Sequence, residues 1–243
     1  MNTGKNGGLK TAGKDGGGIP LADISRFRGE LMGLAMLFII LFHVWVRRDD
    51  PFYGLHRCGN VGVDMFLFLS GVGLWFAWTR HPDTRLFYAR RFARIFPAWL
   101  VMACLFYVPD FLGNGRYSSS LGDLIGLNLG FWEHDELTFW YIPAIMALYI
   151  AAPPYMWLVS RLPVYRWLPV LMVVWCVAVQ WVEPLHSAVG HIEIFWSRVP
   201  VFFLGINAGQ LVMERRRLQK DSMPLLLVAF GMTFGTCLYL EQE

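Results

Sequence analysis

A single histidine, His43, lies near the end of an almost wholly apolar stretch from Glu30 to Val46. A titratable group inside such a stretch is costly unless it faces a cavity or a partner, so it marks a candidate functional site. An imidazole at this place could take a proton from another group, as a general base does. The alternative is a histidine at the membrane interface that is hydrogen-bonded to a neighbour.

The second candidate is Asp64, which ends the segment Gly-Asn-Val-Gly-Val-Asp in the next apolar stretch. We expect it near the outer end of a helix, at about the depth of His43. A carboxylate facing the imidazole would fix its tautomer and favour the imidazolium that forms when it takes a proton. The alternatives are a carboxylate that caps the helix start or pairs with Arg57.

Three arginines, Arg90, Arg91 and Arg94, lie in the segment Phe-Tyr-Ala-Arg-Arg-Phe-Ala-Arg-Ile-Phe-Pro, which ends at Pro97. Arg91 and Arg94 are three residues apart, so on a helix they share one face. Two guanidinium groups on that face suit a phosphorylated ligand. The alternative is a set of arginines that marks the cytoplasmic side or contacts lipid phosphates. It explains less well a cluster that is packed between aromatic residues and stopped by a proline.

These residues belong to a chain of 243 residues that is 56% hydrophobic and 16% charged, which is typical of an integral membrane protein. A Gly- and Lys-rich tail, residues 1–24, precedes one domain over residues 25–243. The sequence predicts an all-α polytopic membrane bundle of about seven spans. The predicted spans are Leu31–Val46, Val61–Trp78, Ile95–Leu112, Leu137–Val159, Val164–Val182, Val199–Met213 and Pro224–Leu240. The segment Leu121–Trp132 is predicted to be interfacial or re-entrant.

The distribution of Lys and Arg predicts the orientation. Basic residues concentrate in the tail and in every second connection, so we expect a cytoplasmic N-terminus in the inner (plasma) membrane. The arginines do not follow one polar face, so there is no nucleic-acid signature. The four cysteines form no metal-type pair, and only Cys58, in a predicted external loop, is a candidate for reactivity. Four histidines in polar loops are expected to be solvated, namely His56, His134, His186 and His191.

Five ordered blocks of sequence resemble the membrane acyltransferase-3 family. They are the run ending Ile-Leu-Phe-His43, the block Gly-Val-Asp-Met-Phe-Leu-Phe-Leu-Ser-Gly, the arginine block ending at Pro97, the Phe139-Trp140-Tyr141 segment with Tyr149 and Pro153, and Arg198-Val-Pro-Val-Phe-Phe-Leu-Gly205. The resemblance implies transfer of an acyl group, usually acetyl from acetyl-CoA, to a hydroxyl of an extracytoplasmic carbohydrate or another cell-envelope molecule. No permanently bound cofactor and no metal are implied.

The resemblance also assigns roles to residues. His43 corresponds to the family's catalytic histidine, and Arg91 and Arg94 to its Arg-x-x-Arg pair, held to engage the acyl donor, with Arg90 beside them. The role of Asp64 does not come from the resemblance: by its expected depth alone, it would orient His43 or balance its charge.

Four further residues are candidates for the acceptor side: Trp140, Tyr141, Tyr149 and Arg198. For Trp140 and Tyr141 the aromatic belt of the membrane interface is the stronger interpretation. Arg198 either contacts the acceptor or anchors its helix.

The chain departs from the family pattern in three places. Many members have Arg-Gly eleven residues before the histidine, where this chain has Met32-Gly33, and Arg28 lies one turn earlier. A glutamate found in some members is replaced by Ile145. The family usually has about ten spans, so we expect an incomplete member.

The competing functions are a transporter or flippase for a glycan or lipid precursor and a non-catalytic membrane partner.

Overall fold

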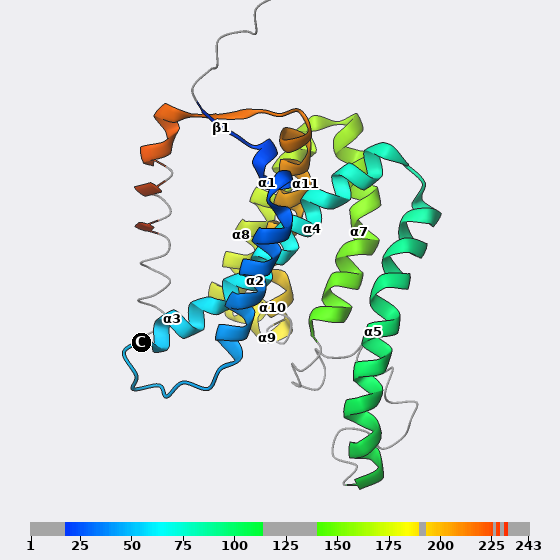
Figure 1. The fold of residues 1–243 in the computed structure, drawn as a ribbon, viewed down its shortest axis with the longest axis vertical. Helices are drawn as coiled ribbons and strands as arrows, with labels where there is room; N and C mark the ends of the chain where they lie inside the picture. The colour runs from blue at the N-terminus through cyan, green and yellow to red at the C-terminus, as the bar shows by residue number, and fades with distance from the viewer. Residues whose placement is uncertain (1–17, 114–139, 190–192, 226, 229–230, 233–243) are drawn as a thin grey trace, which may run out of the picture.

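The computed structural model describes residues 18–113, 140–189, 193–225, 227–228 and 231–232 (Figure 1). Helices make up nearly all of this part of the chain, which confirms the predicted all-α membrane bundle. In chain order the elements are β1 (Gly18–Pro20), α1 (Ala22–Arg26), α2 (Arg28–His43), α3 (Tyr53–Arg57), η1 (Cys58–Asn60), α4 (Val61–Arg80), α5 (Thr84–Gly113), α7 (Tyr141–Arg161), η3 (Pro163–Trp167), α8 (Leu168–Trp181), α9 (Glu183–Val189), α10 (Glu193–Trp196), α11 (Val199–Met213), β2 (Arg217–Gln219) and η5 (Lys220–Ser222).

Six of the seven predicted spans correspond to helices, namely α2, α4, α5, α7, α8 and α11. By length and apolar composition, the described residues hold three helices able to cross a membrane, or up to four if a bent pair counts as one span. This is fewer than the seven predicted, because α2 and α11 have only 16 and 15 residues and need flanking residues to cross a bilayer. Most of the seventh segment and all of Leu121–Trp132 lie outside the described residues.

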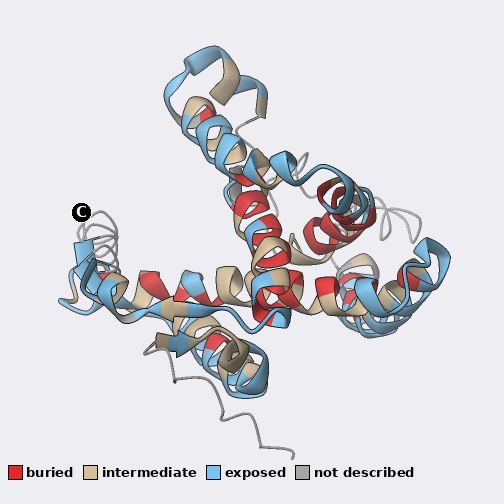
Figure 2. Ribbon diagram, turned by 90° about the horizontal axis from the view of Figure 1, so that it is seen from above, coloured by how far each residue is buried: buried red, intermediate tan, exposed pale blue. Residues whose placement is uncertain are grey.

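The core forms where α4 crosses α11, with α7 packed against both, as the buried residues in Figure 2 show. Two glycines allow the close approach of α4 and α11. A Cβ on Gly71 would collide with the backbone of Phe202, and a Cβ on Gly205 would collide with the backbone of Phe68. Fully buried side chains from α4 and α11, among them Leu74 and Phe202, surround the crossing. Small residues at a helix interface are the usual way in which membrane helices pack.

Helix α2 lies antiparallel on the first half of α4, and small residues again set the contact. A Cβ on Gly62 would meet the carbonyl oxygen of Ala35, and a Cβ on Gly59 would meet the backbone of Phe38 and Phe42. Ala35 is fully buried in this contact. The register therefore places the start of α4 beside the second half of α2.

Helix α5 runs without interruption from Thr84 to Gly113, with Pro97 and Pro109 inside it. The prediction that Pro97 stops the arginine segment is therefore wrong. Proline removes one backbone hydrogen bond and kinks a helix, but apolar packing can carry the helix through it. As a result, the arginine segment and the third apolar segment form one continuous helix.

The connections that are rich in arginine lie at one end of the bundle (Figure 1). There β1 pairs with β2 in antiparallel register, Ile19 opposite Leu218, and joins the start of the described chain to the segment after α11. Residues 18–24, which the sequence assigns to the flexible tail, form β1 and the beginning of α1.

Candidate functional site

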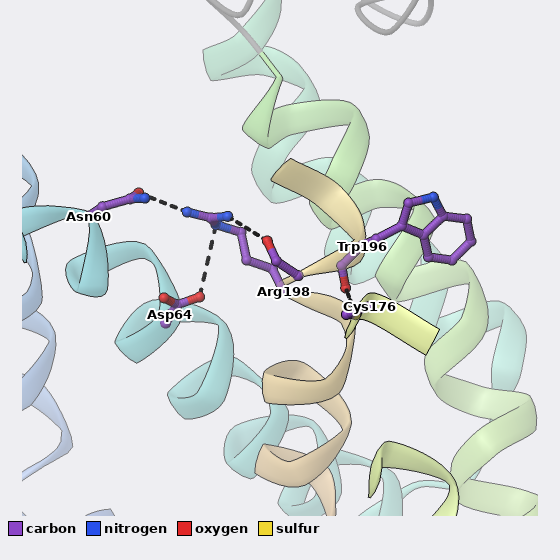
Figure 3. A network of polar contacts seen from close by, with 6 residues as sticks. Asn60, Asp64, Cys176, Trp196 and Arg198 are labelled. Carbon is purple, nitrogen blue, oxygen red and sulfur yellow. Dashed lines mark hydrogen bonds and ion pairs between the residues drawn. The ribbon is translucent and has the colours of Figure 1, made fainter. Parts of the chain in front are cut away.

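A buried arginine, Arg198, organises a polar cluster at the start of α11 (Figure 3). Its side chain donates hydrogen bonds of 2.8 Å from Nη2 to Asn60 Oδ1 and from Nη1 to Ser197 Oγ. Its Nε lies 3.9 Å from Asp64 Oδ1, and its Cζ lies 5.1 Å from the centre of the Trp140 ring. Arg198 is only 7% exposed. Its charge is therefore compensated by groups of the protein itself.

Asp64 does not occupy the predicted place beside His43. Its carboxylate faces Arg198 instead (Figure 3). The helix register explains the difference, because the contact of Gly62 with Ala35 puts Asp64 beside the middle of α2. His43 is eight residues beyond Ala35, about 12 Å further along the helix axis. The sequence gives the depth of each residue in its own helix, but not the offset between two helices.

His43 is the last residue of α2 and is exposed. Its Nδ1 lies 2.8 Å from the backbone carbonyl oxygen of Ile39, one turn earlier in the same helix. A carbonyl oxygen only accepts hydrogen bonds, so Nδ1 is the donor and, in the neutral ring, Nε2 carries the lone pair. A backbone group thus fixes the tautomer, which is the role that the sequence assigned to Asp64.

The loop after α2 folds back on Phe42. The ring of His56 stacks on the Phe42 ring at 6.0 Å between centroids, and the Arg57 guanidinium lies 5.2 Å from the centre of the same ring. Both ring nitrogens of His56 are buried, so the prediction that this histidine is solvated is wrong. Cys58 is buried as well, which removes it as a reactive thiol. Nδ1 of His186 is buried as well, so the prediction is also wrong for that side of its ring. His134 and His191 lie outside the described residues.

The predicted arginine cluster lines a cavity of about 180 Å³ where α4 meets α5. All three arginines named from the sequence contribute to it. The lining residues are Ala77, His81, Leu86, Phe87, Arg90, Arg91 and Arg94. An arginine is charged at every physiological pH, so this is a cationic cavity at the arginine-rich end of the bundle.

Arg91 is the most enclosed arginine of this cavity. Its guanidinium lies 5.8 Å from the Phe87 ring centre and 5.7 Å from the ring centre of Tyr149 on α7. It is also within electrostatic range of Arg94 and Arg28, both of the same sign. Among the described residues, no carboxylate forms an ion pair with Arg91 or Arg94. Aromatic faces hold the cation in place but leave its charge unneutralised.

Aromatic residues of α7 connect the two clusters. Tyr149 contacts Arg91 and is within electrostatic range of Tyr141. The Tyr141 ring packs edge-on against Trp140 at 6.0 Å, and Trp140 lies against Arg198. The four residues predicted for the acceptor side are thus brought into one series, but Tyr149 lies at its far end, against Arg91. These side chains form a polar and aromatic line through an otherwise apolar core.

Sequence reasoning missed several polar groups of these clusters. Asn60 and Ser197, which bind Arg198, are common residues whose role depends on a helix far away in the sequence. His81 lines the arginine cavity, and its position directly after the basic end of α4 was the available signal. The sequence indicates Arg28 only as a replacement for the arginine that many family members have at position 32.

Comparison with known proteins places this arrangement in a family. Residues 31–242 match the family model of the acyltransferase-3 family, described as an acyltransferase domain. The chain belongs to the acyltransferase-3 family. The resemblance seen in the five sequence blocks is confirmed, and the apolar helices agree with a membrane acyltransferase. No curated protein and no solved structure matches the chain.

Proposed function

We propose that this acyltransferase-3 protein transfers an acyl group, acetyl from acetyl-CoA, to a hydroxyl of a carbohydrate or another cell-envelope molecule on the far side of the membrane. The observation that carries the proposal is the placement of two unlike groups at opposite ends of one bundle. A cationic cavity lies at one end, and an exposed imidazole with a free Nε2 lies at the other. We assign the arginine-rich end to the cytoplasm of an inner-membrane protein, in keeping with the positive-inside rule.

The cationic cavity suits the phosphates of the acyl donor. Guanidinium groups bind phosphate oxygens through paired hydrogen bonds. Arg91 is held in position by the Phe87 and Tyr149 rings, so little side-chain freedom is lost when it binds an anion. Arg90 and Arg94 are exposed at the same cavity and could follow the ligand as it enters.

Helix α2 sets the distance that the acyl group has to bridge. It has 16 residues, so its ends at Arg28 and His43 lie about 22 Å apart. The nucleotide of CoA would stay at the arginines while the long pantetheine arm extends along the bundle. The line of Tyr149, Tyr141 and Trp140 offers polar and aromatic surface along part of this distance.

The chemical step then needs one base. Nε2 of His43 takes the proton of the acceptor hydroxyl while the hydroxyl oxygen attacks the thioester carbonyl carbon. A C–O bond forms and the C–S bond breaks. The proton on Nε2 passes to the leaving thiolate, which releases free CoA thiol. In a two-step variant Nε2 itself attacks, and the acyl-imidazole is then transferred to the hydroxyl.

Inverted membrane vesicles test the proposal. Acetyl-CoA labelled in the acetyl group is supplied outside, and label is measured on material in the lumen. We expect label with the wild-type protein and none with His43→Ala, whereas His186→Ala, on the separate helix α9, serves as the control. Undiminished labelling with His43→Ala would refute the catalytic role. Absence of label in every variant would favour transport or a non-catalytic role.

A further inference from the structure

Arg28, the first residue of α2, reaches across to α4 and lies on a glycine. If Gly73 carried a Cβ, that atom would be only 2.6 Å from each of the Arg28 Nη atoms and 2.7 Å from its Cζ. The guanidinium therefore occupies the space that any other residue at this position would fill. The Arg28 guanidinium thus packs directly against the backbone of Gly73.

This placement leaves Arg28 incompletely neutralised. Its Nε is buried and has no hydrogen-bond partner among the described residues. No carboxylate of the described residues forms an ion pair with it. A buried guanidinium nitrogen without an acceptor is expensive, so such groups in proteins normally bind something.

Arg28 is also close to the arginine cavity, because Gly73, on which it packs, lies one helical turn before Ala77, which lines that cavity. Arg28 repels Arg91 electrostatically, as Arg94 does. Three cations, one on α2 and two on α5, therefore lie near this cavity. No carboxylate of the described residues forms an ion pair with any of them. Like charges in a region of low dielectric repel strongly unless an anion lies between them. The arrangement calls for a multiply charged anion.

We propose that Arg28, seated on Gly73, is a third phosphate-binding residue that acts together with Arg91 and Arg94 on one anionic group. This inference rests on the proposed function where it identifies that anion as a phosphate of the acyl donor. The same chemistry could be supplied by a lipid headgroup, and the experiment separates the two sources. Met32, where many family members have arginine, is not needed for this site.

Two variants perturb Arg28 in different ways, and each has a matched control. Arg28→Gln removes the charge, and Arg26→Gln removes an exposed charge two residues away that lies over Phe27. Gly73→Ala displaces the guanidinium from the Gly73 backbone. The new methyl group collides only with the flexible end of the Arg28 side chain, so the fold should survive. Gly33→Ala, with nothing within 4 Å of its Cβ, adds the same methyl group to a neighbouring helix without displacing anything.

The measurement is CoA affinity of the full chain in phosphatidylcholine nanodiscs. We expect the Kd to rise about tenfold for Arg28→Gln, the loss of one charge-assisted hydrogen-bonding group, and several-fold for Gly73→Ala. Both controls should stay within about twofold of wild type. If Arg28→Gln and Gly73→Ala bind CoA as well as their controls do, the role of Arg28 in donor binding is overturned. The proposed function would survive that result, because its own test is the labelling lost in His43→Ala.

The second arm applies if wild type binds no CoA, which contradicts the proposed donor. The variants are then purified from membranes that contain phosphatidylglycerol, and the retained lipid is counted. Less lipid on Arg28→Gln and Gly73→Ala than on their controls would identify the anion as a headgroup phosphate and leave the role of Arg28 intact. Equal retention in all variants would overturn it.

Discussion

The bundle contains two clusters built around arginine, and they differ in how the positive charge is balanced. Arg198 is almost completely buried, but Asn60, Ser197 and Asp64 satisfy or balance its guanidinium. Arg91 and Arg28 are less buried, yet no carboxylate of the described residues neutralises them. The protein itself balances the charge of the first, closed cluster, whereas no carboxylate of the described residues balances the second, open cluster.

The difference indicates what each cluster does. A charge that is balanced by a carboxylate and by hydrogen bonds within the fold positions helices, here α4, α7 and α11, and its removal damages the structure. A group of unpaired cations is tolerated because a ligand completes it, and its removal damages binding. The two clusters should therefore respond to mutation in different measurements.

The largest effect is expected for the closed cluster. Arg198→Ala leaves Asp64 and Asn60 without their partner, so the free energy of unfolding should fall by about 3 kcal/mol. Thermal unfolding in detergent measures this, with Arg26→Ala as the exposed control. The double variant Arg198→Met with Asp64→Leu should recover much of the loss, because no charge then stays unpaired. Equal melting temperatures for Arg198→Ala and wild type would remove the distinction between the clusters.

For the open cluster we expect a small effect on stability and a large effect on ligand binding. Arg91→Gln removes a cation that Arg28 and Arg94 both repel, so thermal stability should change by less than about 1 kcal/mol. CoA affinity should nevertheless fall at least tenfold, roughly the value of one charge-assisted contact. A variant that unfolds as readily as Arg198→Ala would show that Arg91 is a structural residue.

A carboxylate introduced into the open cluster should neutralise part of its positive charge. Ala77 lines the arginine cavity, and Ala77→Glu would place a carboxylate among the guanidinium groups. We expect CoA affinity to fall about tenfold while the melting temperature holds or rises, because the new charge competes with the ligand. Ala77→Gln has the same shape without the charge and should weaken binding much less. Equal effects of the two variants would mean that bulk, not charge, matters there.

The smallest effect is expected at the rim. Arg90 lines the same cavity but is exposed, so solvent and salt screen its charge. Arg90→Gln should weaken CoA binding by only about twofold. A loss as large as that of Arg91→Gln would move the binding site toward the surface.

Much of this architecture could be predicted from the sequence. The apolar segments gave the helices, and the spacing of Arg91 and Arg94 put both on one cavity. What the sequence could not give is the offset between helices. The glycine contacts that set it, such as Gly62 on Ala35, separate Asp64 from His43 and bring it to Arg198.

The same limit applies to partners that are distant in the chain. Asn60 and Arg198 are 138 residues apart in sequence, and neither residue type predicts a contact with the other. The seat of Arg28 on Gly73 depends on the crossing of two helices. The backbone carbonyl that orients His43 was missed for another reason, because side-chain patterns carry no information about which backbone groups are available.

The central claim is that the donor enters at the arginine cavity and the acyl group leaves at the His43 end. Sealed vesicles of both orientations, each given labelled acetyl-CoA only on the outside, test it directly. The account predicts label on the lumenal acceptor in inverted vesicles and none in right-side-out vesicles, where the arginines face the lumen. Equal labelling in the two orientations, or labelling only in the right-side-out vesicles, would contradict it.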